Sequence, residues 1–287
     1  MKVILDRIST EIEYRRMSKR KIAKNIKIAH STISNFLTGK DEMKFNAYGE
    51  FIREIYPNEK QILIRRELYI EYFSKTSRPI NKRIGMDYLA VHGEMELLKL
   101  LINQEINSDD EINKEWAQIY KLLYLRNTEE LKGSTFANLL YETEKDIKLK
   151  TNEMKILFKI IEMFTEYDQS NFKVMTDKAS FLIDELKEIK NSYIRLSFEC
   201  KVRECILQGL LLSDEIEKTR QLCHEIIANN ELKRKFPMIV ATAYGVLGES
   251  YTFTNFEKAR FFIEEAVKIL EKGLNEKMKM RHHMMLD

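Results

Sequence analysis

Glycine, proline and cysteine are all scarce in this chain of 287 residues, which has nine Gly, three Pro and three Cys. Glycine and proline form the turns on which β-rich and α/β folds depend, so their scarcity argues against both fold classes. Cys200, Cys205 and Cys223 show neither C-x-x-C spacing nor clustered histidines, so we expect reduced core residues. No uncharged run reaches the roughly 18 residues that a membrane span needs, and the first residues lack the apolar stretch of a signal peptide. We therefore expect a cytoplasmic, nearly all-helical protein with no membrane partner.

Several catalytic and cofactor motifs are also missing. The sequence contains no P-loop, dinucleotide-binding, zinc-protease or nucleophile-elbow pattern, and its five histidines form no set suited to metal or nucleophile chemistry. We expect no enzyme activity, no cofactor and no metal ion. What is present is 44% hydrophobic and 32% charged residues, enough for a substantial core under a mixed-charge surface. The length suits two domains.

Positive charge is concentrated near the amino terminus. Residues 1–56 contain twelve Lys and Arg against seven Asp and Glu, a net charge of +5, although the whole chain carries only +3. Such an asymmetry indicates an anionic partner for this segment, with nucleic acid as the first expectation and a membrane surface as the second.

Apolar spacing predicts short helices in this basic segment. Ile4, Ile8 and Ile12 recur every fourth residue and predict a helix over residues 3–16. Ser18 is a candidate N-cap for a second helix. After a turn at residues 27–29, a third helix is predicted over residues 30–37, and a fourth, 46–56, closes the small domain. Gly39 is expected to end the third helix with a left-handed backbone. We expect the core of this domain to contain Ile22, Ala23, Ile33, Phe36, Leu37, Phe45, Tyr48, Phe51, Ile52 and Ile55.

Two short helices joined by a tight turn form a helix-turn-helix motif, whose second helix enters the major groove of DNA. The third helix offers short polar side chains that reach base edges, and we expect these to read the sequence: His30, Ser31, Thr32, Ser34 and Asn35. Nearby cations would neutralise phosphates and set the affinity: Lys19, Arg20, Lys24, Lys40 and Lys44. The alternative is a basic helical pair that serves only as a protein contact.

The same stretch resembles the DNA-binding motif of the phage-repressor (Cro/repressor) class. The matching positions are Ser18 at the cap, Ile22 and Ala23 at the Leu-Ala pair, Ile28 at the Val, Ile33 and Ser34 at the Ile-Ser pair, and Gly39 at the closing glycine. Two positions depart from the pattern, because Lys27 stands where a turn glycine is usual and Leu37 replaces a common Glu.

Pro57 disfavours a helical conformation at Tyr56, so we place a domain boundary there and expect a second domain over residues 57–287. Its sequence is a series of amphipathic segments, which indicates a helical solenoid. One unit, residues 241–270, resembles the tetratricopeptide pattern through Leu247, Gly248, Tyr251, Ala259, Ile263 and Ala266. We expect Gly248 and Ala259 to allow close helix packing, and Tyr251 and Ile263 to fill the gaps between units.

Stacked helix pairs build a curved surface with a concave inner face. The polar residues expected on that face could hold an extended peptide, although they could equally be a solvated helix face. These candidate peptide-binding residues are Lys201, Glu204, Gln208, Thr242, Glu249 and Thr252.

Most of residues 1–270 resemble the arbitrium receptors of temperate Bacillus phages, which are helix-turn-helix peptide-pheromone receptors with tetratricopeptide-like repeats. The resemblance lies in Lys150, Thr151, Glu153–Ile156, Tyr193, Ser197–Glu199, Val202, Gly248, Ser250 and Tyr251. It implies a quorum-sensing transcription factor that binds double-stranded operator DNA, loses that activity when a short signalling peptide binds, and controls phage lysogeny. Members of this family usually form a homodimer and are longer than 287 residues, so dimerisation of this chain stays open.

The alternative hypothesis is an interaction protein whose solenoid captures another protein, with DNA binding weak or lost.

Overall fold

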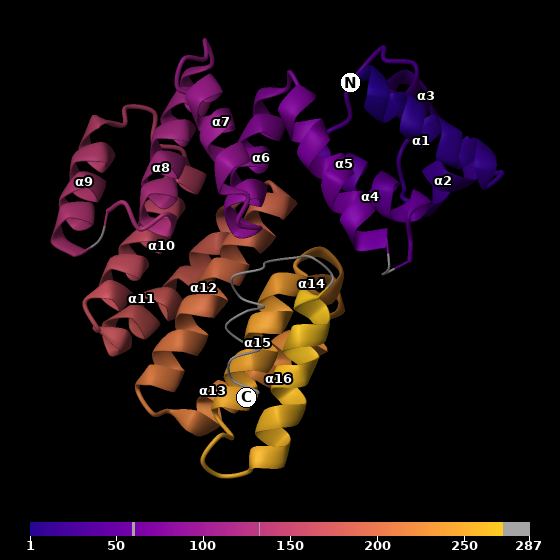
Figure 1. The fold of residues 1–287 in the computed structure, drawn as a ribbon. Helices are drawn as coiled ribbons and strands as arrows, with labels where there is room; N and C mark the ends of the chain where they lie inside the picture. Colours follow the sequence, from indigo (N-terminus) through magenta and orange to yellow (C-terminus); the bar gives the residue numbers. More distant parts are fainter. Residues whose placement is uncertain (59–60, 132, 272–287) are drawn as a thin grey trace. The chain divides into compact units, whose positions relative to one another are not determined.

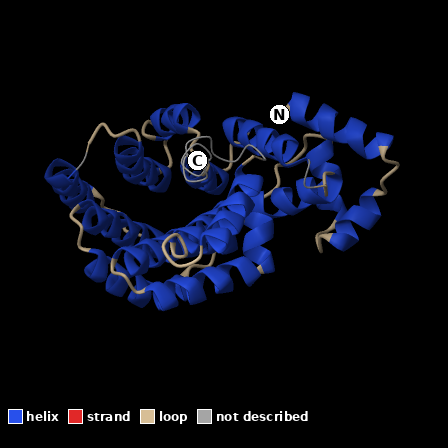
Figure 2. Ribbon diagram, turned by 60° about the horizontal axis from the view of Figure 1, so that its bottom comes forward, coloured by secondary structure: helices blue, strands red, loops and turns tan. Residues whose placement is uncertain are grey.

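The computed structural model describes residues 1–58, 61–131 and 133–271. All regular elements in this part of the chain are helices, which Figure 2 shows, and the predicted all-α fold class is confirmed. Contacts between residues divide the chain into two compact units. Unit 1 comprises Met1–Leu89 and Glu96–Ala117, and unit 2 comprises Ala90–Met95 and Gln118–Asp287.

Unit 1 begins with the predicted helix-turn-helix and continues through further helices (Figure 1). Its elements are α1 (Lys2–Tyr14), α2 (Lys19–Asn25), α3 (His30–Leu37), α4 (Phe45–Ile55), α5 (Ile62–Lys75), α6 (Pro79–Val91), α7 (Met95–Glu105) and α8 (Glu111–Asn127). The last residues of α6 and the second part of α8 belong to unit 2.

The first helices lie close to their predicted positions. Ile4, Ile8 and Ile12 are buried along one side of α1, as their spacing predicts. Ser18 has the extended backbone of an N-cap, but its hydroxyl accepts no hydrogen bond from α2, so its predicted capping role is only partly correct. Leu37 is half-buried instead of buried, because the core face of α3 is taken by Ile33 and Phe36 and Leu37 is the last residue of that helix.

An aromatic cluster joins the helix-turn-helix to the helices that follow it. Tyr48 of α4 stacks on Tyr72 of α5 with ring centroids 4.0 Å apart, and Phe45 lies 4.6 Å from Phe73. The whole cluster comprises Phe36, Phe45, Tyr48, Phe51, Tyr69, Tyr72, Phe73 and Tyr88. The predicted boundary at residue 56 therefore lies inside unit 1, whose core includes α5 and α6.

Unit 2 is a succession of helices that pack on their neighbours. Its further elements are α9 (Gly133–Asp146), α10 (Asn152–Asp168), α11 (Phe172–Glu185), a short 3₁₀ helix η2 (Leu186–Glu188), α12 (Ser192–Leu212), α13 (Ile216–Ala228), α14 (Asn230–Lys235), α15 (Pro237–Glu249) and α16 (Phe256–Leu270). Each of α10, α11 and α12 packs on the next, α13 packs on α15, and α15 packs on α16. This stacking confirms the predicted solenoid-like repeat.

Local signals in the sequence mark the helix starts of unit 2. Asn191 accepts hydrogen bonds from the backbone amides of Tyr193 and Ile194 at 3.0 and 3.2 Å, and caps α12. Asn255 accepts one from the Lys258 amide at 3.0 Å and caps α16 in the same way.

Gly248 permits the close approach of α15 and α16. A Cβ atom at this position would lie 2.6 Å from Ile263 Cγ1 and 3.0 Å from the Ala259 carbonyl oxygen, so any larger side chain requires the helices to separate. The prediction that Gly248 and Ala259 allow close helix packing is confirmed.

Candidate functional sites

The third helix has one buried and one exposed side, as a DNA-reading helix requires. Ile33 and Phe36 are 0% and 1% exposed and fix α3 to the core of unit 1. The five polar residues predicted to read bases all lie on α3: His30, Ser31 and Asn35 are exposed, and Thr32 and Ser34 are half-exposed. They therefore share one short, accessible helix within unit 1.

The predicted phosphate-binding cations lie on α2 and on the segment that follows α3. All five side chains are exposed, and none is paired with a carboxylate of the described residues: Lys19, Arg20, Lys24, Lys40 and Lys44. Unpaired cations around an exposed polar helix attract the phosphate backbone of nucleic acid.

The turn between α2 and α3 requires a left-handed residue. Lys27 occupies that position with a φ of 56°, and Gly39 follows α3 with a φ of 70°. The predicted conformation of Gly39 is confirmed. Lys27 adopts the same conformation without the freedom of glycine, at a cost of about 1 kcal/mol.

A cavity of about 260 Å³ lies in unit 2. Its apolar wall is formed by Ala90, Val91, Leu123, Phe164, Phe236, Met238 and Ile239, and its polar part by Arg126, Asn127, Cys200, Lys201, Glu204 and Thr242. Residues from α6, α8, α10, α12 and α15 thus meet at one place, and only the packing of these helices brings them together.

Two cations and one carboxylate line this cavity. Arg126 is held by Asp168, with Nη2 2.9 Å from Oδ1, and lies 4.7 Å from the centroid of the Phe164 ring. Lys201 is only 9% exposed, and its Nζ donates to the Ser197 hydroxyl at 3.0 Å. Glu204, one helical turn further along α12, is exposed. With Asp168, which pairs with Arg126, two cations and two carboxylates lie at or beside this cavity.

The structure brings together half of the residues predicted to bind peptide. Lys201, Glu204 and Thr242 line the cavity, whereas the other three do not. Gln208 is half-buried further along α12. Glu249 lies near the thiol of Cys223, whose pKa is raised to about 12 by burial and, in addition, by this carboxylate. Thr252 is exposed beyond the end of α15.

No sequence pattern pointed to Arg126 or Phe164. They lie on α8 and α10, whereas the predicted peptide-binding residues lie on α12, on α15 and just after α15.

Cys200, Cys205 and Cys223 are free and buried, which confirms their predicted place in the core. Burial also raises the pKa of the Cys205 thiol, so this group is not nucleophilic near neutral pH.

Among the described residues, we find no helix with the length and hydrophobicity required to cross a membrane.

These features define a helical protein that joins a helix-turn-helix to a repeat unit with a partly charged cavity. A family model described as AimR transcriptional regulator-like matches residues 65–286. The chain belongs to this AimR-like family of transcriptional regulators, and the expected relationship to arbitrium receptors is confirmed.

A curated protein and two solved structures are also similar to this chain. A Bacillus anthracis protein described as uncharacterized is 30% identical over 157 residues, which are 55% of this chain and 58% of that protein. The alignment thus spans less than two thirds of this relative.

The solved structure of selenomethionine-labelled phAimR superimposes with a TM-score of 0.74 at 19% identity, covering 99% of this chain and 69% of that chain. A structure of phAimR with its ligand gives 0.65 at 20% identity, covering 86% and 67%. At these identities the similarity concerns the fold.

Proposed function

We propose that this chain is a transcriptional regulator that binds double-stranded operator DNA through α3 and is controlled by a short signalling peptide bound in the cavity of unit 2. The observation that carries the first half is the two-sided α3, which buries Ile33 and Phe36 and leaves a polar side accessible. An exposed helix with short polar side chains, presented by a helix-turn-helix, fits the major groove.

The exposed cations extend this surface on both sides of α3 along the chain. Lys19, Arg20 and Lys24 belong to α2, and Lys40 and Lys44 follow α3. Phosphate contacts of this kind supply affinity and make it depend on salt, while the polar residues of α3 supply the discrimination between bases. A homodimer over two operator half-sites belongs to this proposal, since helix-turn-helix proteins commonly bind in that way.

The cavity supports the second half. Its volume of about 260 Å³ is below the roughly 300–1,000 Å³ of typical ligand pockets, so it suits one end of a peptide better than a whole peptide. Arg126 and Lys201 favour an anionic group, and the apolar wall favours an aliphatic or aromatic side chain beside it. A peptide carboxyl terminus combines both features. A ligand is present in one solved phAimR structure of this fold, which is consistent with ligand control here.

Peptide control requires that the peptide bind more tightly to one conformation of the protein than to another, because equal affinity shifts no equilibrium. From the resemblance to arbitrium receptors we infer the direction: the peptide lowers the affinity for operator DNA. The output inferred in the same way is the choice between lysis and lysogeny of a phage.

DNA binding is tested by selecting genomic fragments on the purified full-length protein, sequencing them, and measuring the affinity for the enriched site against salt. Replacing Thr32 and Asn35 together by Ala should weaken binding to that site by about 1–3 kcal/mol per lost base contact and relax its sequence preference. Replacing Lys24 by Ala should weaken binding to all DNA sequences equally. It should also reduce the slope of log affinity against log salt concentration by about 1. The matched control replaces Thr10 and Asn103, two exposed residues elsewhere in unit 1, by Ala.

Base reading by α3 would be contradicted if the selection enriched no sequence. It would also be contradicted if the variant with Thr32 and Asn35 replaced bound the enriched site as tightly as the control.

Peptide binding is tested with a library of short synthetic peptides, each made with a free carboxyl terminus and as the terminal amide. We expect binders only in the free-acid set, because a terminal carboxylate can accept hydrogen bonds from the cations Lys201 and Arg126 in the cavity wall, whereas a terminal amide offers them no charge. Lys201→Met should remove this preference, whereas Gln208→Ala, on the same helix but outside the cavity, should keep it. Equal binding of acids and amides to the unchanged protein would reject the proposed orientation.

One observation favours the alternative function of a protein-capturing solenoid. Phe253, Phe256 and Phe261, at and after the turn from α15 to α16, are 100%, 65% and 55% exposed, and exposed aromatic side chains are typical of protein interfaces. Replacing all three by Ser should abolish capture of a protein partner if this function dominates, and should leave DNA binding and peptide binding unchanged if the regulator function does.

A further inference from the structure

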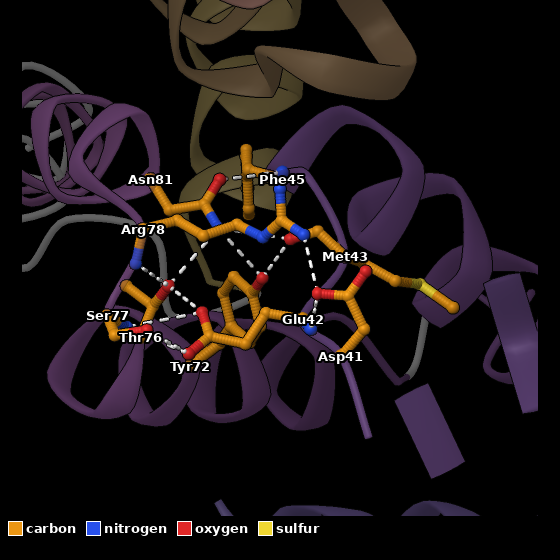
Figure 3. A network of polar contacts seen from close by, with 9 residues as sticks. All are labelled: Asp41, Glu42, Met43, Phe45, Tyr72, Thr76, Ser77, Arg78 and Asn81. Atoms are coloured by element: carbon orange, nitrogen blue, oxygen red, sulfur yellow. Dashed lines mark hydrogen bonds and ion pairs between the residues drawn. The ribbon is translucent and has the colours of Figure 1, made fainter. Parts of the chain in front are cut away.

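A polar network ties the segment that follows α3 to α5 and α6, as Figure 3 shows. Four of its residues come from the chain that follows α3: Asp41, Glu42, Met43 and Phe45. The other five come from α5, α6 and the connection between them: Tyr72, Thr76, Ser77, Arg78 and Asn81. We refer to these nine residues as the α3 anchor. All of them belong to unit 1.

Asn81 is at the centre of the α3 anchor and is completely buried. Its Oδ1 accepts a hydrogen bond from the Phe45 amide at 3.0 Å. Its Nδ2 donates toward the Met43 carbonyl at 3.0 Å and the Tyr72 hydroxyl at 2.9 Å. The Tyr72 hydroxyl in turn donates to the same Met43 carbonyl. One side chain therefore satisfies the backbone on both sides of Lys44, deep inside the protein.

Glu42 forms the second part of the α3 anchor. Its carboxylate accepts hydrogen bonds from the Thr76 hydroxyl, from the Ser77 amide at 2.9 Å and from the Ser77 hydroxyl at 2.8 Å. Beside it, Arg78 Nη2 lies 2.7 Å from Asp41 Oδ1. Burial opposes ionisation of Glu42, but the donors outweigh it and hold its pKa below the ordinary value. The contacts thus depend on the ionised carboxylate.

The anchored segment is continuous with the last turn of α3. The amide of Lys40 donates to the Asn35 carbonyl at 2.8 Å, and Asn35 is one of the exposed residues expected to read bases. From the buried side of the same helix, Phe36 lies 6.3 Å from Tyr72, centroid to centroid. Tyr72 therefore touches both the buried side of α3 and the segment that leaves it.

We propose that Asn81 is a positioning residue for DNA recognition: through the α3 anchor it holds α3 in the orientation that binds the groove, without touching nucleic acid itself. This inference rests on the DNA binding proposed above. Recognition by side chains requires that the helix presenting them be fixed by its own surroundings. The functional DNA-binding element then extends through α6 instead of ending at residue 56.

The test uses the full-length protein with Asn81→Leu, which has the same branched skeleton of four side-chain heavy atoms as Asn and removes every hydrogen bond of the Asn81 side chain. We expect operator affinity to fall about tenfold, since the buried Phe45 amide loses its acceptor on Asn81 and the Met43 carbonyl loses one of its two donors, which displaces the segment. The salt slope should stay unchanged, because no phosphate contact is lost. Hydrogen exchange of the amides in residues 38–45 should become faster.

Ser74→Ala is the matched control, because the Ser74 hydroxyl donates only within α5, to the Glu71 carbonyl at 2.8 Å. It should change neither affinity nor exchange. If Asn81→Leu does not fold, Thr76→Val takes its place, since it removes the hydroxyl that bonds to Glu42 and that accepts from Asn81 at 3.2 Å.

Unchanged exchange and unchanged affinity in a folded variant would overturn the proposal, and so would faster exchange with unchanged affinity. If the unmodified protein selects no DNA, the proposed function itself fails. Exchange of residues 38–45 then still decides whether Asn81 holds the segment.

Discussion

The guanidinium carbon of Arg220 in α13 lies 3.9 Å from the centroid of the Tyr251 ring, which follows the end of α15. The same guanidinium donates from Nη2 to the Ser250 carbonyl at 2.7 Å and from Nε to the Ser250 hydroxyl at 3.2 Å. Tyr251 thus connects two successive helix pairs, and its predicted position between repeat units is confirmed.

Arg220→Met should destabilise the protein by about 1–3 kcal/mol, because it removes a charge-assisted hydrogen bond and a cation–π contact while keeping an apolar stem. Denaturant unfolding measures the change. Arg260→Met is the control: Arg260 pairs with Glu264 on the exposed side of α16, and its loss should cost less than about 0.5 kcal/mol. Equal effects of the two substitutions would show that the Arg220 contact contributes nothing specific.

Gly248→Ala should lower the free energy of unfolding by about 1–3 kcal/mol, because the new Cβ would lie 2.6 Å from Ile263 Cγ1 and 3.0 Å from the Ala259 carbonyl oxygen. Gly49→Ala in α4 is the matched substitution. Its Cβ would meet only the end of the Arg53 side chain at 3.7 Å, so it should be neutral or stabilising by up to about 1 kcal/mol. Thermal melting of both variants checks the prediction, which is wrong if Gly248→Ala melts at or above the temperature of the unmodified protein.

Lys27→Gly should stabilise the protein by about 0.5–1 kcal/mol. Glycine relieves the left-handed strain at a φ of 56°, although the more flexible unfolded chain offsets part of the gain. Lys21→Gly, within α2, should instead destabilise by about 1 kcal/mol. Relative to the unmodified protein, the free energy of unfolding should rise for Lys27→Gly and fall for Lys21→Gly. A destabilised Lys27→Gly protein would contradict the turn geometry.

Unit 1 should lose stability in acid through Glu42. The hydrogen bonds from Thr76 and Ser77 lower the pKa of this carboxyl in the folded state despite its burial. Its contribution is therefore complete above the ordinary glutamate pKa of about 4.3 and is lost as the pH falls through the lowered folded-state value.

Fluorescence of Trp116, the only tryptophan of the chain and a buried residue of unit 1, follows unfolding at each pH. Glu42→Gln should flatten this acid dependence. An identical pH profile in the variant would assign the acid loss to other groups.

The sequence was sufficient for features that depend on neighbours along the chain. The fourfold spacing of Ile4, Ile8 and Ile12 predicts α1, because a helix places such residues on one side. Gly39 and Pro57 mark helix ends, since glycine permits a left-handed backbone and proline disfavours a helical backbone at the residue before it. The motif of short polar residues after a tight turn likewise predicts an exposed α3.

The candidate site was predictable only in part. Lys201 and Glu204 share α12 and could be placed together from their spacing, but Arg126 and Phe164 reach the same cavity from α8 and α10. Gln208, Glu249 and Thr252 followed the same helical spacing and yet lie outside it, because spacing along one helix does not specify which neighbouring helices cover it.

By itself, then, the sequence determined the helices, their ends and the basic amino-terminal surface, since these follow from interactions over a few residues. Only the tertiary structure decided that α5 and α6 belong to the core of the helix-turn-helix, and that Asn81 bonds to the backbone of Phe45, 36 positions earlier. Contacts at that separation depend on how whole helices pack, and packing is selected by the shape and burial of all the side chains together.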